Sequence, residues 1–399
     1  MTTGWRISSV TSTARTCVLM PAHMSDSALI NRATLIIDQV SADSPADYVL
    51  RGVLGADKSI PAHEKRDISR AVFSYYRWLH WLDKAASTQS RLASALDLQS
   101  KFDQAPSGFK IETLAARAVP EWLKSELDLT DGYLRHLQTD PALWIRVQKE
   151  FAAALPRSLG NCTPSASFLV PEARRSTTLR YSGNIDLFKT PEFQQGVFEI
   201  QDLSSQLVGY AADPKPGETW WDTCAGEGGK TLHLSELMEN KGLIWASDRN
   251  TGRIATLRKR AGRAQAFNYR AVTWNGGPFL PTKTKFDGIL VDAPCSGVGT
   301  WQRNPHARWT TTPDDVKELA DIQLQLLNHA APALKPGGRL IYAVCTLTRS
   351  ETTKVADAFT AEHPELSSDP VLGQGPRLHL LPHELDANGM FIAAWKKRG

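Results

Sequence analysis

Apolar residues recur at helical spacing through the first part of the chain, from about residue 25 to residue 142. One such stripe runs through residues 29–40 and another through residues 68–82. Because side chains three and four positions apart share one face of a helix, these stripes predict the core of an all-α bundle. No residues here have the spacing of a catalytic site, so we expect the bundle to dock RNA or a partner, or to act as a scaffold.

The pattern changes twice further along the chain. Residues 143–214 contain short strand-like runs punctuated by glycine and proline, as in PRSLGNCTPSASFLVPEARR, and predict a small α+β linker domain. From residue 215 to residue 399, short apolar runs alternate with helical stretches, beginning with ETWWDTCAG, KTLHLSELMEN and GLIWASD. This β-α-β alternation predicts an α/β fold with a doubly wound, mostly parallel, Rossmann-like sheet, which binds ligands at the carboxyl ends of its strands.

Composition narrows the class of protein. The chain has 399 residues, of which 42% are hydrophobic and 22% are charged, enough for two or three domains with a buried core. No apolar run approaches the roughly 20 residues of a membrane helix, so an integral membrane protein is excluded. The 46 basic and 42 acidic residues leave a mildly basic chain, which is compatible with a nucleic-acid partner without requiring one.

The cysteines and the N-terminal segment bear on the compartment. Five cysteines lie far apart without a C-x-x-C pair, so we expect neither a disulfide scaffold nor a metal site. This usage indicates a reducing compartment, and we predict the cytoplasm. Residues 1–24 are rich in serine and threonine and contain Arg6 and Arg15 but no acid, which resembles a transit peptide. A disordered tail, or a misplaced start with Met24 as the true one, is the simpler interpretation.

A glycine-rich turn, DTCAGEGGKT at residues 222–231, follows the first strand of the predicted sheet. Glycines let the backbone approach a ligand closely, and the N-terminus of the next helix favours negative groups. The turn does not match two common phosphate-binding patterns. A Walker A loop would need a glycine where this chain has Cys224, and the dinucleotide pattern G-x-G-x-x-G would need one where it has Thr231. Asp248 ends the next strand, 20 residues after Gly228, where an acid commonly binds ribose hydroxyls. S-adenosylmethionine, a nucleoside cofactor without phosphate, fits this pattern; the structural alternative is a tight turn and a helix cap.

Two cysteines each follow an apolar strand, Cys295 in DGILVDAPCSGVG and Cys345 in YAVCTLT. In a parallel sheet, both thiols would face one cleft. Methylation of a pyrimidine at C5 needs a thiolate that adds to C6 and so makes C5 nucleophilic. It also needs a group that protonates or hydrogen-bonds N3, so that the ring can accept the electron density, and a carboxyl such as Asp292 could be that group. A single cysteine is more often a small buried hydrophobe, but the pair together with Asp292 favours this chemistry. The D-A-P-C sequence argues against methylation of an amine, and the spacing leaves open which cysteine attacks.

Six motifs run in the order seen in RNA cytosine-5 methyltransferases, namely QDLSSQ, DTCAGEGGKT, DAPCSG, RNPHARW, KPGGRLIYAVCTL and NGMFIAAW. Over about residues 195–399 the chain resembles the RsmB/Sun (Fmu) type of bacterial rRNA enzyme within the NOL1/NOP2/Sun family. Residues 25–142 resemble, more weakly, the NusB-like RNA-binding domain of those enzymes. The resemblance implies that Cys345 is the nucleophile, that Cys295 assists release of the product, and that Asp292 contacts the cytosine.

The same resemblance implies S-adenosylmethionine as the cofactor. Its expected binding residues are Cys224, Ala225, Gly226, Glu227, Gly228, Gly229, Lys230, Asp248, Asn275 and Asp292. The chain departs from the family pattern C-A-[AP]-P-G-G-K at Gly226 and Glu227, and it has Asn275 where the family has an Asp near the adenine. Val344 replaces a Thr, and residues 350–352 read Ser-Glu-Thr in place of E-E-N. Both thiols and the carboxyl beside them are kept, so we expect activity.

Two segments are candidates for RNA contact. Residues 249–270 contain seven basic residues and no acid, which suits a phosphate-binding face or a solvated helix face. Residues 301–309 interleave aromatic and cationic side chains, namely Trp301, Arg303, His306, Arg308 and Trp309. These side chains suit a flipped-out base and its neighbours, and the alternative is packing of the loop.

These observations leave three functional hypotheses. We favour a methyltransferase that forms 5-methylcytosine in small-subunit (16S) rRNA. The alternatives are the same reaction on tRNA, and a non-catalytic RNA-binding or ribosome-assembly protein with a degenerate cofactor site. The expected partner is RNA, no membrane is involved, and the expected state is a monomer.

Overall fold

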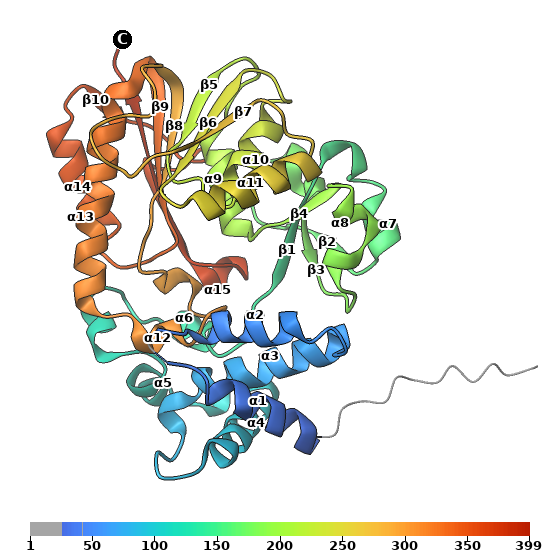
Figure 1. Cartoon of the computed structure of the whole chain (residues 1–399). Coiled ribbons are helices and arrows are strands. Elements are labelled where there is room, and N and C mark those ends of the chain that lie inside the picture. Colours follow the sequence, from blue (N-terminus) through green and yellow to red (C-terminus); the bar gives the residue numbers. More distant parts are fainter. Residues whose placement is uncertain (1–25, 42) are drawn as a thin grey trace, which may run out of the picture.

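The computed structural model describes residues 26–41 and 43–399, so the predictions for residues 1–24 lie outside the described part of the chain. Its first part is helical and lies at the bottom of Figure 1. The helices are α1 (Asp26–Ile37), α2 (Ala46–Ala56), α3 (Ala62–Arg77), α4 (Thr88–Gln104), α5 (Ile111–Arg117) and α6 (Asp131–His136). Both predicted stripes are confirmed, because Ala33 of α1 packs in one buried core with Ile68 and Val72 of α3. No helix in the described residues is long and apolar enough to cross a membrane.

A small antiparallel sheet follows, with the strand order β2-β3-β1-β4. Its strands are β1 (Leu143–Val147), β2 (Cys162–Pro164), β3 (Thr178–Tyr181) and β4 (Phe198–Ile200), with the short helices α7 (Leu155–Leu159) and α8 (Pro191–Gln194) between them. Ile145, Leu179 and Phe198 are fully buried in its core. The α+β content agrees with the predicted pattern, while the domain boundaries at residues 142 and 214 stay predictions.

The large sheet has the strand order β10-β12-β9-β8-β5-β6-β7, with β11 paired to β12. Its strands are β5 (Thr219–Asp222), β6 (Leu243–Asp248), β7 (Tyr269–Thr273), β8 (Phe286–Asp292), β9 (Leu334–Val344), β10 (Leu366–Ser368), β11 (Arg377–Leu380) and β12 (Met390–Lys397). The run β9-β8-β5-β6-β7 is parallel throughout, and β12 joins it antiparallel to β9. The predicted α/β fold with a doubly wound, mostly parallel sheet is therefore confirmed.

Helices cover both faces of this sheet (Figure 1). The first face carries α9 (Leu203–Ala212) and α10 (Gly229–Leu237), and the other carries α13 (Pro313–Ala330) and α14 (Thr353–Glu362). Since successive side chains of a strand point to opposite faces, Trp220 lies in the first core and Trp221 in the second. The basic helix α11 (Thr251–Arg263) packs beside α10 against β6. The helix α9 covers this sheet although it lies before residue 215, where the α/β pattern in the sequence begins.

Residues 301–309 join the helical part of the chain to the large sheet. Trp301 and Arg308 have no exposed surface. The Trp301 ring packs in an apolar core made mainly of residues from the helical part. The Arg308 guanidinium donates to the carbonyl oxygens of Ala118, at 2.8 Å, and Leu137, at 3.0 Å. These contacts contradict the predicted RNA role of Trp301 and Arg308 and support the alternative, packing of the loop.

The end of this segment makes similar contacts. The short helices α12 (Ala307–Thr310) and α15 (Pro382–Leu385) lie between the large sheet and the helical part (Figure 1). In α12, the Trp309 indole donates to the carbonyl oxygen of Tyr76 at 2.7 Å and stacks on His80, with 3.9 Å between ring centroids. The helical part is therefore joined firmly to the loop that follows Cys295.

Candidate active site

A cavity of about 570 Å³ opens where β5, β6, β8 and β9 end. The carboxyl ends of parallel strands meet at one edge of a sheet, so residues far apart in the sequence come together here. The predicted site residues that line it are Cys224, Ala225, Gly226, Glu227, Gly229, Lys230, Asp248, Asn275, Asp292, Cys295 and Cys345. The remaining one, Gly228, is buried beside Leu257. The structure thus brings the predicted residues together, while their roles stay proposals.

The glycine-rich turn joins β5 to α10. Gly226 and Gly228 have positive φ angles of 53° and 88°, in the left-handed region that favours glycine. A Cβ atom on Gly228 would lie 2.7 Å from Cγ of Leu257, so α11 leaves no room for a side chain at this position. The turn therefore leaves its backbone accessible from the cavity, and α10 begins at Gly229.

The Asp248 carboxylate ties the end of β6 to this turn. Its Oδ2 accepts from the Gly226 amide at 2.9 Å, and its Oδ1 accepts from the Asn250 amide at 2.7 Å. Each oxygen has a further lone pair, so the carboxylate can also accept from the hydroxyls of a ribose. Glu227 and Asn275, two of the departures from the family pattern, are exposed residues of the lining. These two departures therefore leave the buried part of the site unchanged.

Lys230 and Asp292 form an ion pair in the cavity, with 2.7 Å between Nζ and Oδ2. Lys230 comes from the first turn of α10, and Asp292 is the last residue of β8. Burial opposes the charge of Lys230, but the pairing with Asp292 outweighs it and raises the pKa of the lysine. An ammonium group and a carboxylate are thus held together in the cavity that contains the thiols.

The two predicted catalytic thiols are in contact. Cys345 directly follows β9, Cys295 lies in the loop after β8, and their sulfur atoms are 3.3 Å apart. A hydrogen bond from the Cys295 thiol lowers the pKa of Cys345, and the same bond raises the pKa of Cys295. Cys345 is therefore the thiol that ionises first, which favours it as the nucleophile.

Cys224 and Asp222 flank this site at the start of the glycine-rich turn. Burial raises the pKa of Cys224 to about 12, so this third thiol stays protonated at neutral pH. Burial also raises the pKa of Asp222 to about 7, and its Oδ2 accepts from the Thr231 hydroxyl at 2.6 Å. Asp222 is not among the predicted site residues, although it ends the first strand directly before the turn; it has no exposed surface and lies outside the lining of the cavity.

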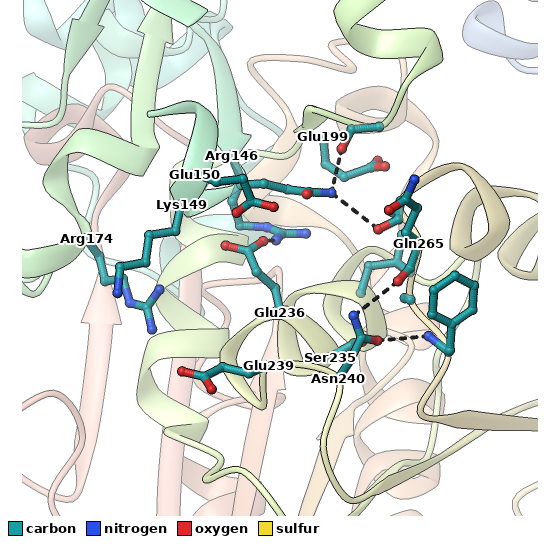
Figure 2. Close-up of a pocket in the computed structure, with 16 residues that line it drawn as sticks. Arg146, Lys149, Glu150, Arg174, Glu199, Ser235, Glu236, Glu239, Asn240 and Gln265 are labelled. Carbon is teal, nitrogen blue, oxygen red and sulfur yellow. Dashed lines mark hydrogen bonds and ion pairs between the residues drawn. The ribbon is translucent and has the colours of Figure 1, made fainter. Parts of the chain in front are cut away.

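A second cavity, of about 450 Å³, lies where the small sheet meets α10 and α11 (Figure 2). Charged side chains surround it, and Arg146 pairs there with Glu236. Glu199 of β4 binds Arg263 and also Arg260, at 2.9 Å from the latter. These two arginines of α11 are therefore structural. The remaining basic residues of the segment 249–270 are exposed and leave the phosphate-binding hypothesis open, namely Arg249, Arg253, Arg258, Lys259 and Arg270.

Mild oxidation is expected to join Cys295 and Cys345 in a disulfide. Their sulfur atoms are 3.3 Å apart, and a thiolate at Cys345 is the species that attacks an oxidised partner. Diamide, which accepts the two hydrogens that the thiols lose, should produce the crosslink in the purified protein, as detected by peptide mapping without reductant. A Cys162→Ser variant should form it equally well, because Cys162 lies in β2. Two free thiols after diamide treatment would contradict this prediction.

The fold and the cavity define the class of the protein. The sheet order reverses between β5 and β8, the glycine-rich turn follows β5, and an acid ends β6 and binds that turn. This is the arrangement of a class I methyltransferase. Residues 209–396 match the family model described as 16S rRNA methyltransferase RsmB/F. The resemblance to the RsmB/Sun type is thereby confirmed.

Two curated relatives are named probable ribosomal RNA small subunit methyltransferase B. The protein of Bacillus subtilis (strain 168) is 40% identical over 221 residues, which cover 52% of this chain and 49% of the relative. The protein of Synechocystis sp. is 33% identical over 296 residues, which cover 69% of this chain and 64% of the relative. The chain thus spans about half to two thirds of these relatives. The crystal structure of PH0851, at 24% identity, shares the fold with a TM-score of 0.74 over 92% of this chain and 98% of that one.

Proposed function

We propose that this protein is an S-adenosylmethionine-dependent methyltransferase that forms 5-methylcytosine in small-subunit (16S) rRNA. The contact between the Cys295 and Cys345 sulfur atoms, 3.3 Å apart, carries the proposal. Methylation of cytosine at C5 needs one thiol that adds and later leaves, and a second group that assists its departure. The names of the two relatives, which refer to small-subunit rRNA, support the class of substrate.

The residues of the cavity fit S-adenosylmethionine. Asp248 offers carboxylate oxygens to the ribose, and the glycine-rich turn lies beside it. The volume of about 570 Å³ lies in the range of small-molecule sites. We assign Glu227 to the amino-acid moiety and Asn275 to the adenine amine. When bound, the cofactor supplies an electrophilic methyl group.

The chain supplies the groups that activate the cytosine. The Cys345 thiolate forms a bond to C6, and the displaced electron density moves toward C5 and N3. The proton that the Cys345 thiol loses is taken up at N3, which lets the ring accept this density, and the Asp292 carboxylate, held by Lys230, accepts a hydrogen bond from the N3–H so formed. After methylation, loss of the C5 proton to a base restores the C5–C6 double bond and expels the Cys345 thiolate. Cys295 is assigned to this release, because its sulfur lies 3.3 Å from the departing sulfur and its thiol can donate a proton to it.

Transfer of labelled methyl groups to RNA tests the proposed function. Unmodified 16S rRNA and a tRNA transcript serve as parallel substrates, and the product is identified as 5-methylcytidine after nuclease digestion. We expect label in rRNA at C5 of cytosine. Label in tRNA alone would support the tRNA alternative. Binding of S-adenosylmethionine without transfer to either RNA would support the non-catalytic alternative.

A further inference from the structure

A buried carboxylate lies between the two loops that carry the thiols. Glu351 follows β9, in the segment that leads to α14, and has no exposed surface. It accepts hydrogen bonds from Ser296 N (2.8 Å), Ser296 Oγ, Gln323 Nε2 (3.0 Å), Thr346 Oγ1 (3.2 Å) and Thr348 Oγ1 (2.8 Å). Among the described residues, no Lys, Arg or His forms an ion pair with it. A buried anion without a cation is stable only where donors of this kind surround it.

These donors come from both thiol loops. Ser296 directly follows Cys295, and Thr346 directly follows Cys345. Gln323 of α13 adds a further link, because its amide also donates, at 2.9 Å, to the carbonyl oxygen of the residue before Cys295. One carboxylate therefore connects the two backbone segments whose sulfur atoms lie 3.3 Å apart.

The helical part of the chain holds the same segment. Glu126 accepts from the amide and from the hydroxyl of Ser350, both at 2.8 Å. Arg349 forms an ion pair with Asp128 at 2.6 Å. Because Arg349 and Ser350 directly precede Glu351, the carboxylate is fixed both by the thiol loops and by the helical part.

We propose that Glu351 is a positioning residue that keeps the Cys295 and Cys345 thiols in contact for the reaction. It lies outside the lining of the cavity and acts through Ser296 and Thr346. An amide in place of the carboxylate keeps one acceptor oxygen and puts an N–H donor where the other oxygen accepts from three hydroxyl groups, so those three bonds would have to break or reverse and the two loops would separate. The inference rests on the proposed function, which gives the contact between the thiols its purpose.

The variant Glu351→Gln in the full chain tests this role. We expect kcat for methyl transfer to fall about 100-fold, because small displacements of reacting groups cost rates of this order. KM for RNA and the Kd of S-adenosylmethionine should stay at the wild-type values. The yield of the diamide crosslink between Cys295 and Cys345 should fall as well. Glu318→Gln, at an exposed position of α13, is the matched control and should change none of these quantities.

A second variant covers the case in which Glu351→Gln fails to fold, as judged by thermal unfolding. Ser296→Ala removes one of the donors, the hydroxyl, and leaves the backbone amide and the carboxylate in place, so it should lower kcat and crosslink yield in the same direction by a smaller factor. Wild-type kcat and crosslink yield in a folded variant would overturn the positioning role. Absence of methyl transfer by the wild type would overturn the proposed function instead, and the crosslink, measured without RNA, would still report the position of the thiols.

Discussion

Replacement of Cys345 by alanine is expected to abolish methyl transfer, with a fall in rate of at least roughly 1,000-fold, as for other catalytic nucleophiles. The Cys345 sulfur is the atom assigned to bond C6, and without it C5 stays a poor nucleophile. Cys224 cannot take over, because burial raises its pKa to about 12. The measurement is transfer of labelled methyl groups to 16S rRNA, with S-adenosylmethionine binding measured alongside. Binding should survive, since Asp248 and the glycine-rich turn are unchanged.

The companion variant Cys295→Ala distinguishes the two thiol roles. Loss of the group that assists release should leave Cys345 bonded to C6, so a covalent RNA adduct resistant to denaturing gels should accumulate. Cys162→Ser, in the small sheet, is the control and should form no adduct. An adduct in Cys345→Ala in place of Cys295→Ala would show that the assigned roles are reversed.

Trp301→Ala is expected to destabilise the protein by about 3–5 kcal/mol, the range for loss of a large buried aromatic side chain. Trp301 has no exposed surface and packs in the core that joins the helical part to the loop after Cys295. Its removal leaves a cavity at that junction. Urea unfolding, followed by circular dichroism, measures the change in the free energy of unfolding.

Phe279→Ala is the matched control for this prediction. The Phe279 side chain is 91% exposed, so its truncation should change stability by less than about 0.5 kcal/mol. If Trp301→Ala kept wild-type stability and instead weakened RNA binding, the base-contact hypothesis would be restored and the packing described here would be wrong.

Much of the candidate site was predictable, because its signals are local. The strands that end at Asp248 and Asp292, and the glycine-rich turn before Lys230, follow from periodicity and turn chemistry within a few residues. The alternation of strands and helices then predicted a parallel sheet, and a parallel sheet places its strand ends on one edge. For this reason, the sequence alone predicts that residues from four separate strand ends form one site.

Other features carried no local signal. Residues 301–309 have the composition of an RNA-binding loop, yet the Arg308 guanidinium binds a carbonyl oxygen 190 residues earlier in the chain. Arg258 and Arg260 lie in the same basic stretch of the sequence, and Arg258 is exposed. Arg260 is structural because it forms an ion pair with Glu199 of β4. In both cases the function of a charged side chain depends on a neighbour that the local sequence does not contain.

The sequence by itself determined which chemical groups are present and that they stand at the ends of parallel strands. The tertiary structure alone decided that the Cys295 and Cys345 sulfur atoms are 3.3 Å apart and that Glu351 joins their loops. The physical reason is distance along the chain: the two thiols are separated by 50 residues, and Ser296 is 55 residues from Glu351. Such contacts arise from the packing of β8, β9, α13 and the helical part against one another, which no local pattern encodes.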